Sequence, residues 1–223
     1  MWRLYQFALC PFSRKVRLVL SERKIPYELC QVLPWRRPPD FRQLNRTGRT
    51  PAMHDAERGI VLADSRAICE YFEETFVGYP MMIGSAEQRA EIRRLVAWFD
   101  EQFYADVTWP LLRGRLIVPV MTGGNRNTGM LPAARRKADA YLDEIGFLLG
   151  NRMWLAGPTL SIADLAVAAQ ISVADYFGGI DWSGHEQAKT WYSVLRSRPS
   201  FQPILAARMG GIEPPPHYSA IDA

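Results

Sequence analysis

The stretch that decides the fold is Leu9-Cys10-Pro11-Phe12-Ser13-Arg14-Lys15-Val16-Arg17. It follows an apolar segment, residues 2–9, that predicts a strand, and its proline suits the first turn of a helix. Cys10 is therefore expected at or near the helix N-cap, where the helix dipole and free backbone amides favour a thiolate. This makes Cys10 a candidate nucleophile, with Ser13 as the competing nucleophile or hydrogen-bond donor. The alternative is that Cys10 is only a small residue that caps the helix.

Residues 1–80 predict the element order β-α-β-α-β-β-α. The expected strands span 2–9 and 27–32, the expected helices span 11–24, 41–44 and 65–75, and a hairpin joins 52–55 to 60–62 around Arg58-Gly59. A βαβ crossover pairs its two strands in parallel. This order is typical of a thioredoxin-like α/β domain.

After the break Gly78-Tyr79-Pro80 the pattern becomes helical only. Residues 81–209 predict an all-α bundle with helices over 86–109, 132–149, 162–176 and 185–196. Residues 123–129 are turn formers and predict a mobile loop. The proline-rich tail, residues 210–223, has few core residues, so it is either a frayed end or an extended peptide presented to a partner, with Tyr218 and Asp222 projecting.

Composition narrows the class of protein. With 48% hydrophobic and 22% charged residues in 223, the chain should be globular, with two modest domains. No apolar run approaches the roughly 20 residues of a membrane span, and the N-terminus lacks a leader pattern, so we expect a cytoplasmic protein. Three scattered cysteines, Cys10, Cys30 and Cys69, predict neither a disulfide framework nor a metal site.

The positive charge is concentrated near the N-terminus. Residues 1–80 hold 13 Lys and Arg against 9 Asp and Glu, an excess equal to the whole net charge of +4. One segment contributes Arg36, Arg37, Arg42, Arg46 and Arg49 against a single acid, Asp40. Such a segment would attract an acidic partner. Nucleic acid is disfavoured because neither interleaved aromatic residues nor a recognition helix is visible.

Over essentially its whole length the chain resembles the glutathione transferase superfamily. The resemblance rests on Cys10-Pro11-Phe12, Arg49-Thr50-Pro51-Ala52-Met53, Leu62-Ala63-Asp64-Ser65-Arg66-Ala67-Ile68, Leu160-Ser161-Ile162-Ala163-Asp164-Leu165-Ala166 and Trp191 with Arg198-Pro199-Ser200-Phe201. It implies that Thr50 and a cis Pro51 pair with the cysteinyl part of glutathione. It also implies that Asp64 and Ser65 hold the γ-glutamyl end, and that Ser161 and Asp164 form a capping box. Asp64 replaces the usual glutamate and Thr50 the common valine, which indicates a degenerate glutathione site.

Within the superfamily, residues 33–41 and the ending Pro214-Pro215-Pro216-His217-Tyr218 resemble a group of bacterial division proteins. Members of this group are dimers that bind the tubulin-like protein FtsZ at the division site, and their tail is tied to septal wall synthesis. The resemblance implies that Trp35, Arg36 and Arg37 face FtsZ, since Trp and Arg often anchor interfaces. It implies that Tyr218 and Asp222 belong to a signalling tail. The alternative for Trp35 is that it packs on its own domain.

Two functions therefore remain open. The first is a homodimeric, non-enzymatic regulator of division that binds FtsZ filaments, promotes constriction and needs no cofactor. The second is a glutathione-dependent transferase or thiol oxidoreductase that uses Cys10.

Overall fold

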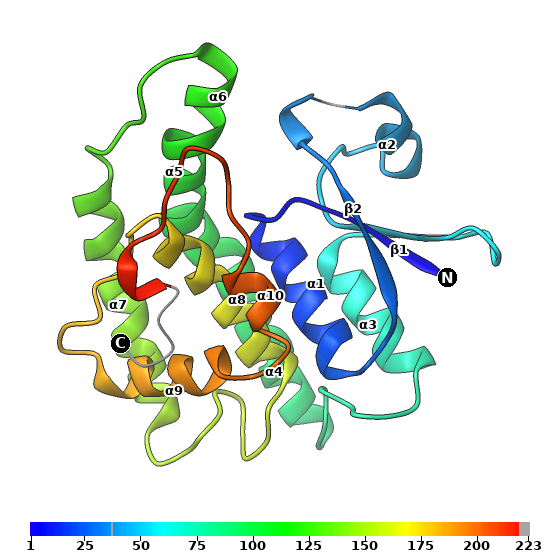
Figure 1. The fold of residues 1–223 in the computed structure, drawn as a ribbon. Helices are drawn as coiled ribbons and strands as arrows, with labels where there is room; N and C mark the ends of the chain where they lie inside the picture. Colours follow the sequence, from blue (N-terminus) through cyan, green and yellow to red (C-terminus); the bar gives the residue numbers. More distant parts are fainter. Residues whose placement is uncertain (37, 219–223) are drawn as a thin grey trace.

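A computed structural model describes residues 1–36 and 38–218. Figure 1 shows a part built on a sheet beside a part built of helices. The predicted fold class, a thioredoxin-like α/β domain followed by an all-α bundle, is confirmed. The first part comprises β1 (Trp2–Gln6), α1 (Pro11–Glu22), β2 (Tyr27–Gln31), η1 (Pro34–Arg36), α2 (Pro39–Leu44), β3 (Ala52–Asp55), β4 (Ile60–Ala63) and α3 (Ser65–Thr75).

The sheet has the strand order β2-β1-β3-β4. β1 pairs with β2 in parallel and with β3 in antiparallel fashion, so that Leu4 lies opposite both Leu29 and Met53. The predicted strand over 2–9 is too long. It ends at Gln6, because the N–H of Cys10 turns back to donate to the carbonyl of Phe7 at 2.9 Å.

Helix α1 lies between the sheet and the helical part, against α3 and α8 (Figure 1). The expected N-cap position of Cys10 and the first-turn position of Pro11 are both confirmed. Several polar and charged side chains of α1 are buried between these neighbours, including Arg14 and Lys15. The helix ends earlier than predicted, because Lys24 adopts a left-handed backbone with φ 57°.

The first helix of the second part is longer than predicted. α4 (Ala86–Trp98), η2 (Phe99–Thr108), α5 (Trp109–Leu112), η3 (Arg113–Ile117) and α6 (Val118–Thr122) follow one another with helical backbone at every joint. η2 and η3 are π-helical. Pro110 and Pro119 each stand in the first turn of the α-helical segment that follows, where a missing N–H costs least. The expected end at Trp109 is therefore wrong.

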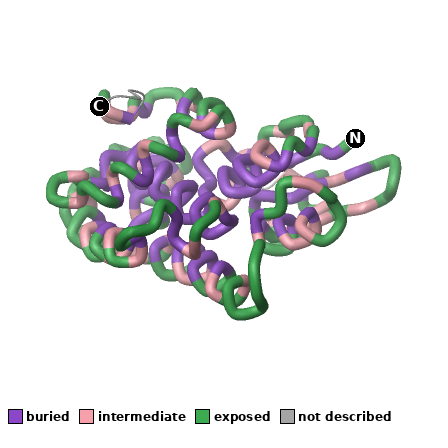
Figure 2. The backbone as a smooth tube through the Cα atoms, turned by 90° about the horizontal axis from the view of Figure 1, so that it is seen from below, coloured by how far each residue is buried: buried purple, intermediate pink, exposed green. Residues whose placement is uncertain are grey.

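Helix α8 (Ile162–Tyr176) is the centre of the helical part, and all of its residues are buried. Figure 2 shows that buried backbone gathers in the interior of the molecule and that exposed segments lie around it. Helix α8 contacts α1, α4, η2 and α9 (Glu186–Arg196), while α7 (Leu131–Leu149) packs on α9 and η2. Asp164 accepts the backbone N–H of Ser161 at 3.0 Å, as expected for a capping box. No helix within 1–36 and 38–218 is long and apolar enough to cross a membrane.

The described part of the tail packs on the helical part after α10 (Gln202–Leu205) and includes a short helix, η4 (Pro216–Tyr218). Both Ile212 and Tyr218 are buried, and the Tyr176 hydroxyl donates to the carbonyl of Ile212 at 2.7 Å. In Figure 1 this red segment lies over the bundle rather than away from it. The expectation that the prolines project Tyr218 outward is wrong, because its ring fills a gap in the core. Asp222 lies outside the described residues.

Candidate functional site: the cleft between the two parts

A cleft of about 1360 Å³ lies between the sheet part and the helical part. One wall brings together Cys10, Thr50, Pro51, Asp64 and Ser65, which come from three separate segments of the sequence. These are the residues that the sequence predicted as nucleophile and glutathione contacts. The opposite wall is largely aromatic and apolar and consists of Tyr104, Trp109, Leu112, Ile117 and Met121.

Cys10 lies at the base of the cleft with 9% of its surface exposed. It has the extended backbone of an N-cap residue, with φ −85° and ψ 117°, yet its side chain makes no capping hydrogen bond. The thiol instead donates to the carbonyl oxygen of Thr50 at 3.4 Å. This bond uses the protonated thiol and joins the start of α1 to the loop before β3.

Ser13 does not belong to the cleft. Its side chain is fully buried, and its Oγ accepts the backbone N–H of Phe7 at 3.5 Å. Because Ser13 is buried in the first turn of α1 and does not line the cleft, its geometry favours a role as hydrogen-bond acceptor over that of nucleophile. The sequence could not distinguish these roles, since both place a small hydroxyl one turn into the helix.

The loop before β3 is rigidly held by side chains. The Thr50-Pro51 peptide bond is cis, as the family resemblance implied. Asn45 Nδ2 donates to the carbonyl of Arg49 at 2.8 Å, and its Oδ1 accepts the N–H of Thr47 at 3.1 Å. The loop therefore presents the backbone around Thr50 to the cleft in one conformation.

Asp64 occupies the turn between β4 and α3 with a strained backbone, φ 76° and ψ 132°. A non-glycine residue in such a conformation costs about 1–3 kcal/mol, and strain of this kind concentrates at functional sites. The carboxylate accepts the N–H groups of Arg66 at 2.7 Å and Ala67 at 3.3 Å. Ser65 follows as the first residue of α3 and is buried. The acid thus serves as the N-cap of α3.

Sequence reasoning missed the residues that the helical part adds to the cleft. Phe12 contacts Tyr104 with ring centroids 4.7 Å apart, and Tyr104 lies 6.0 Å from Trp109. Burial, with a smaller effect from Cys10, raises the pKa of the Tyr104 phenol. Phe12 lies on α1, whereas Tyr104 lies in η2 and Trp109 begins α5. The contact between Phe12 and Tyr104 joins segments far apart in the sequence, so no local pattern indicated it.

A buried ion pair also joins the two walls. Lys15 of α1 bonds to Asp100 of η2, and both side chains are almost completely buried. Asp100 lines the cleft and also approaches Gln170 Nε2 at 3.5 Å. A buried pair of this kind fixes the relative position of α1 and η2, because separating the charges would leave each one uncompensated. Among the described residues, no group of three or more His, Cys, Asp or Glu side chains could hold a metal ion.

Trp35 and Arg36 lie on η1 at the edge of the cleft. Trp35 is half-buried and meets Phe7 edge-to-face, with centroids 5.0 Å apart. It packs on its own domain, which is the alternative that the sequence left open, and the residue also lines the cleft. A role for Trp35 in facing FtsZ stays a prediction. Arg36 is exposed. Arg37 lies outside the described residues.

Exposed arginines surround this edge. We call the set Arg36, Arg42, Arg46 and Arg49 the arginine face; all four are exposed, and none makes an ion pair with a carboxylate in the part of the chain that the structure describes. Tyr218 lies elsewhere, within the helical part. The predicted partner residues therefore lie in two places: Trp35 and Arg36 are at the edge of the cleft, and Tyr218 is in the helical part.

Comparison with known proteins agrees with this geometry. The family model for the glutathione S-transferase N-terminal domain matches residues 9–75. A crystal structure of a glutathione S-transferase from Rhodospirillum rubrum F11 is 41% identical and superimposes with a TM-score of 0.95 over the full length of both chains. The chain belongs to the glutathione S-transferase superfamily.

Within that superfamily the chain is similar to a particular protein. It is 41% identical to FtsZ-localized protein A of Caulobacter vibrioides, over 98% of this chain and 97% of that protein. The structure of FzlA from C. crescentus is 40% identical and superimposes with a TM-score of 0.94, covering 100% of this chain and 99% of the other. Glutathione S-transferase GstB of Escherichia coli is 26% identical over 86% of this chain and 91% of that protein.

Proposed function

We propose that this protein is a glutathione transferase-like regulator of bacterial cell division that is recruited to FtsZ at the division site and does not turn over glutathione. The observation that carries the proposal is the 41% identity to FtsZ-localized protein A along nearly the entire chain. That similarity includes both domains and is well above the 26% shared with GstB. The protein would act in the cytoplasm, bind FtsZ filaments and promote constriction of the dividing cell.

The contacts inside the cleft favour binding over catalysis. The Cys10 thiol is directed at the Thr50 carbonyl, and the Asp64 carboxylate is used to cap α3. Both groups would have to exchange these internal bonds before they could act on glutathione. A residue that is already hydrogen-bonded within the fold loses part of the interaction energy that a ligand offers.

The arginine face is the surface that we assign to the filament. Four exposed guanidinium groups without carboxylate partners in the described chain produce a local positive potential. Such a face speeds encounter with an acidic surface and loses that advantage as salt rises. A homodimer would present the face twice and bind neighbouring FtsZ subunits with increased avidity. We further propose that the tail communicates with the septal wall-synthesis machinery.

The test is co-sedimentation with polymerised FtsZ. Arg36→Glu and Arg46→Glu should each weaken retention in the pellet, and the loss should shrink as salt is added, because the interaction is screened. Arg136→Glu is the matched control, since Arg136 is an exposed arginine on α7 outside the face. Equal retention of all three variants would remove the arginine face from the proposal. Absence of the wild-type protein from the pellet would remove FtsZ binding itself.

One observation favours a second candidate, a glutathione-binding protein. The cleft is open to solvent and still gathers Cys10, a cis Pro51 and Ser65 at the N-terminus of α3, where backbone N–H groups suit a carboxylate. Isothermal titration with glutathione distinguishes the candidates. Saturable binding that is lost in Ser65→Ala would favour the second candidate. The absence of binding heat would favour the first candidate, with the cleft retained from the fold and not used for glutathione.

A further inference from the structure

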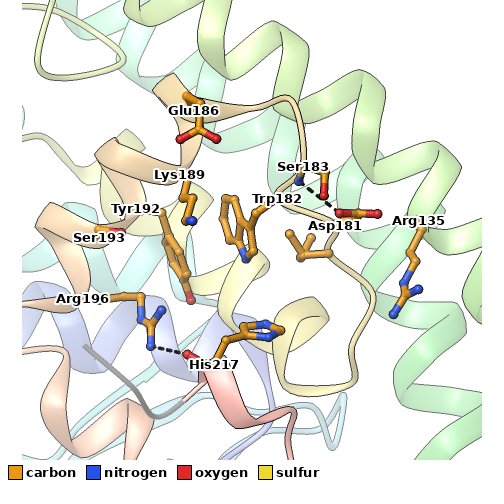
Figure 3. Close-up of a pocket in the computed structure, with 11 residues that line it drawn as sticks. Arg135, Asp181, Trp182, Ser183, Glu186, Lys189, Tyr192, Ser193, Arg196 and His217 are labelled. Carbon is orange, nitrogen blue, oxygen red and sulfur yellow. Dashed lines mark hydrogen bonds between the residues drawn. The ribbon is translucent and has the colours of Figure 1, made fainter. Parts of the chain in front are cut away.

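A second pocket, of about 500 Å³, lies on the helical part away from the cleft (Figure 3). Side chains from α9, from the loop between α8 and α9, from α7 and from the tail surround it. Its volume falls within the range of small-molecule sites, about 300–1,000 Å³. Neither the cleft nor the arginine face includes any of its residues.

Basic side chains outnumber acidic ones in this pocket. Figure 3 shows Lys189 and Arg196 on one side and Arg135 on the other, with His217 between them. Within residues 1–36 and 38–218, neither Arg135 nor Lys189 forms an ion pair with a carboxylate.

The acids of the pocket are already engaged or lie at its edge. Asp181 accepts the backbone N–H of Ser183 at 3.0 Å, and Glu186 is exposed on the first turn of α9. Asp175, beneath the pocket, hydrogen-bonds to Nε2 of His217 at 2.8 Å. Lys189 therefore forms no ion pair with these carboxylates. The hydrogen bonds from Ser183 lower the pKa of the Asp181 carboxyl most, and the charge of Arg135 helps to lower it only at longer range.

The floor of the pocket contains a polar group that lacks a partner. The hydroxyl of Tyr192 is buried, the residue being 1% exposed, and it makes no hydrogen bond within the described residues. Leaving a buried hydroxyl unsatisfied costs about 1–3 kcal/mol. Figure 3 shows the Tyr192 ring directed toward the space between Arg196 and Trp182. An anionic oxygen placed there would accept the tyrosine hydroxyl.

The walls of the pocket are held in place without a ligand. Trp182 stacks on Tyr192 with centroids 5.1 Å apart and an interplanar angle of 17°. Arg135 Nε donates to the carbonyl of Gly178 at 2.9 Å, and Arg196 Nη2 donates to the carbonyls of His217 at 3.0 Å and Tyr218 at 2.7 Å. Groups that are already ordered lose less entropy when a ligand arrives, which favours binding.

We propose that this pocket binds a small organic dianion, either a phosphate monoester or a dicarboxylate, between Lys189 and Arg135, with the Tyr192 hydroxyl donating to it from the floor. Two basic side chains that form no ion pair with a carboxylate within residues 1–36 and 38–218 match two negative charges. The volume of about 500 Å³ fits a small molecule better than a macromolecular surface. Arg196 and His217 also anchor the tail, so a ligand that requires this arrangement would stabilise the packed tail by mass action.

The proposal is tested by isothermal titration of the full-length protein with phenyl phosphate, inorganic phosphate and succinate. Phenyl phosphate or succinate should bind saturably, and Lys189→Gln should weaken the binding about tenfold, as expected for one charge-assisted hydrogen bond. Lys189→Arg should retain most of it. Arg136→Gln, a neutral substitution of an exposed arginine on α7 outside the pocket, should leave it unchanged.

The three probes also distinguish the ligand chemistry. Preference for phenyl phosphate over succinate would assign a phosphate monoester, and the reverse preference would assign a dicarboxylate. Binding of inorganic phosphate alone, the absence of binding by every probe, or equal weakening by Lys189→Gln and Arg136→Gln would each overturn the proposal. Circular dichroism of each variant verifies that the fold is retained.

Discussion

The Tyr218 hydroxyl accepts a hydrogen bond of 3.0 Å from Nη1 of Arg14, across 204 residues of sequence. The same nitrogen donates to Ser172 Oγ at 2.8 Å, and Arg14 Nε donates to the carbonyl of Ala8 at 2.8 Å. All of the Arg14 side chain is buried. One hydrogen-bonded network at the junction of the two domains therefore connects Tyr218 of the tail with α8, α1 and the turn before Cys10.

The first prediction concerns the stability that Tyr218 contributes. Tyr218→Phe should lower the free energy of unfolding by about 1–3 kcal/mol, because Arg14 would lose an acceptor in a buried site. Tyr218→Ala should lower it by about 3–5 kcal/mol, because the ring leaves a cavity against Tyr176. Urea unfolding measures both values.

Tyr79→Phe is the matched control for this prediction. The Tyr79 hydroxyl accepts a hydrogen bond of 3.1 Å from Lys24, but the residue is 59% exposed. Its loss should change stability by no more than about 0.5 kcal/mol. Equal effects of Tyr218→Phe and Tyr79→Phe would show that the tail does not stay packed in solution.

The second prediction concerns pH. The hydrogen bond to Asp175 raises the pKa of His217, against the effect of burial and of the nearby Arg196 and Arg135. Stabilisation by protonated His217 should thus be complete below its unfolded pKa of about 6.5 and should be lost as the pH rises through the folded pKa.

The measurement is the stability difference between the wild-type protein and His217→Gln. It should be larger at about pH 5.5 than at about pH 8.5, on either side of the unfolded pKa. His54→Gln in β3 is the control, because His54 forms no ion pair with a carboxylate in the described chain. A pH-independent difference for His217→Gln would contradict the role of the Asp175 contact.

The third prediction concerns the strained cap at Asp64. Asp64→Asn should be nearly neutral, since asparagine both caps helices and tolerates positive φ. Asp64→Gly should cost only a few tenths of a kcal/mol, because glycine relieves the strain while losing the cap. Asp64→Ala loses the capping hydrogen bonds and keeps the strained backbone, so it should lower the free energy of unfolding by about 1–3 kcal/mol. Thermal unfolding should rank the variants in that order, and an alanine variant as stable as asparagine would refute it.

The fourth prediction concerns Cys10. Under the proposed function, Cys10→Ala should support cell division and lower stability by about 0.5–2 kcal/mol, through loss of a weak hydrogen bond and some packing. Cys10→Ser keeps a donor for the Thr50 carbonyl and should be closer to the wild type. Complementation of a depletion strain, with protein levels verified by immunoblot, measures the outcome. Failure of a folded and abundant Cys10→Ala protein would indicate thiol chemistry.

The sequence predicted the wall of the cleft that the sheet part provides. Pro11 after Cys10 and the cis Pro51 are signals that act within a few residues, so they place the start of α1 and the loop before β3 without knowledge of the rest of the chain. The helices Ser65–Thr75 and Ile162–Tyr176 were predicted with their observed bounds, and their starts follow from the capping residues Asp64 and Ser161 that precede them.

The other features depended on contacts between distant segments. The helix predicted to end at Trp109 continues through Pro110 and Pro119, because it packs on α8 and α7 and each proline stands in the first turn of an α-helical segment that follows a π-helical one. Tyr218 lies in a proline-rich segment that locally favours extension, yet it is buried because Arg14 and Tyr176 offer it a partner and a cavity. Local sequence thus determined the order of the elements in the sheet part and one wall of the cleft. Tertiary packing alone decided three features: the aromatic wall of the cleft, the packed tail and the basic pocket beside the tail. The reason is that the free energy of burying apolar surface outweighs the local conformational preference of these segments.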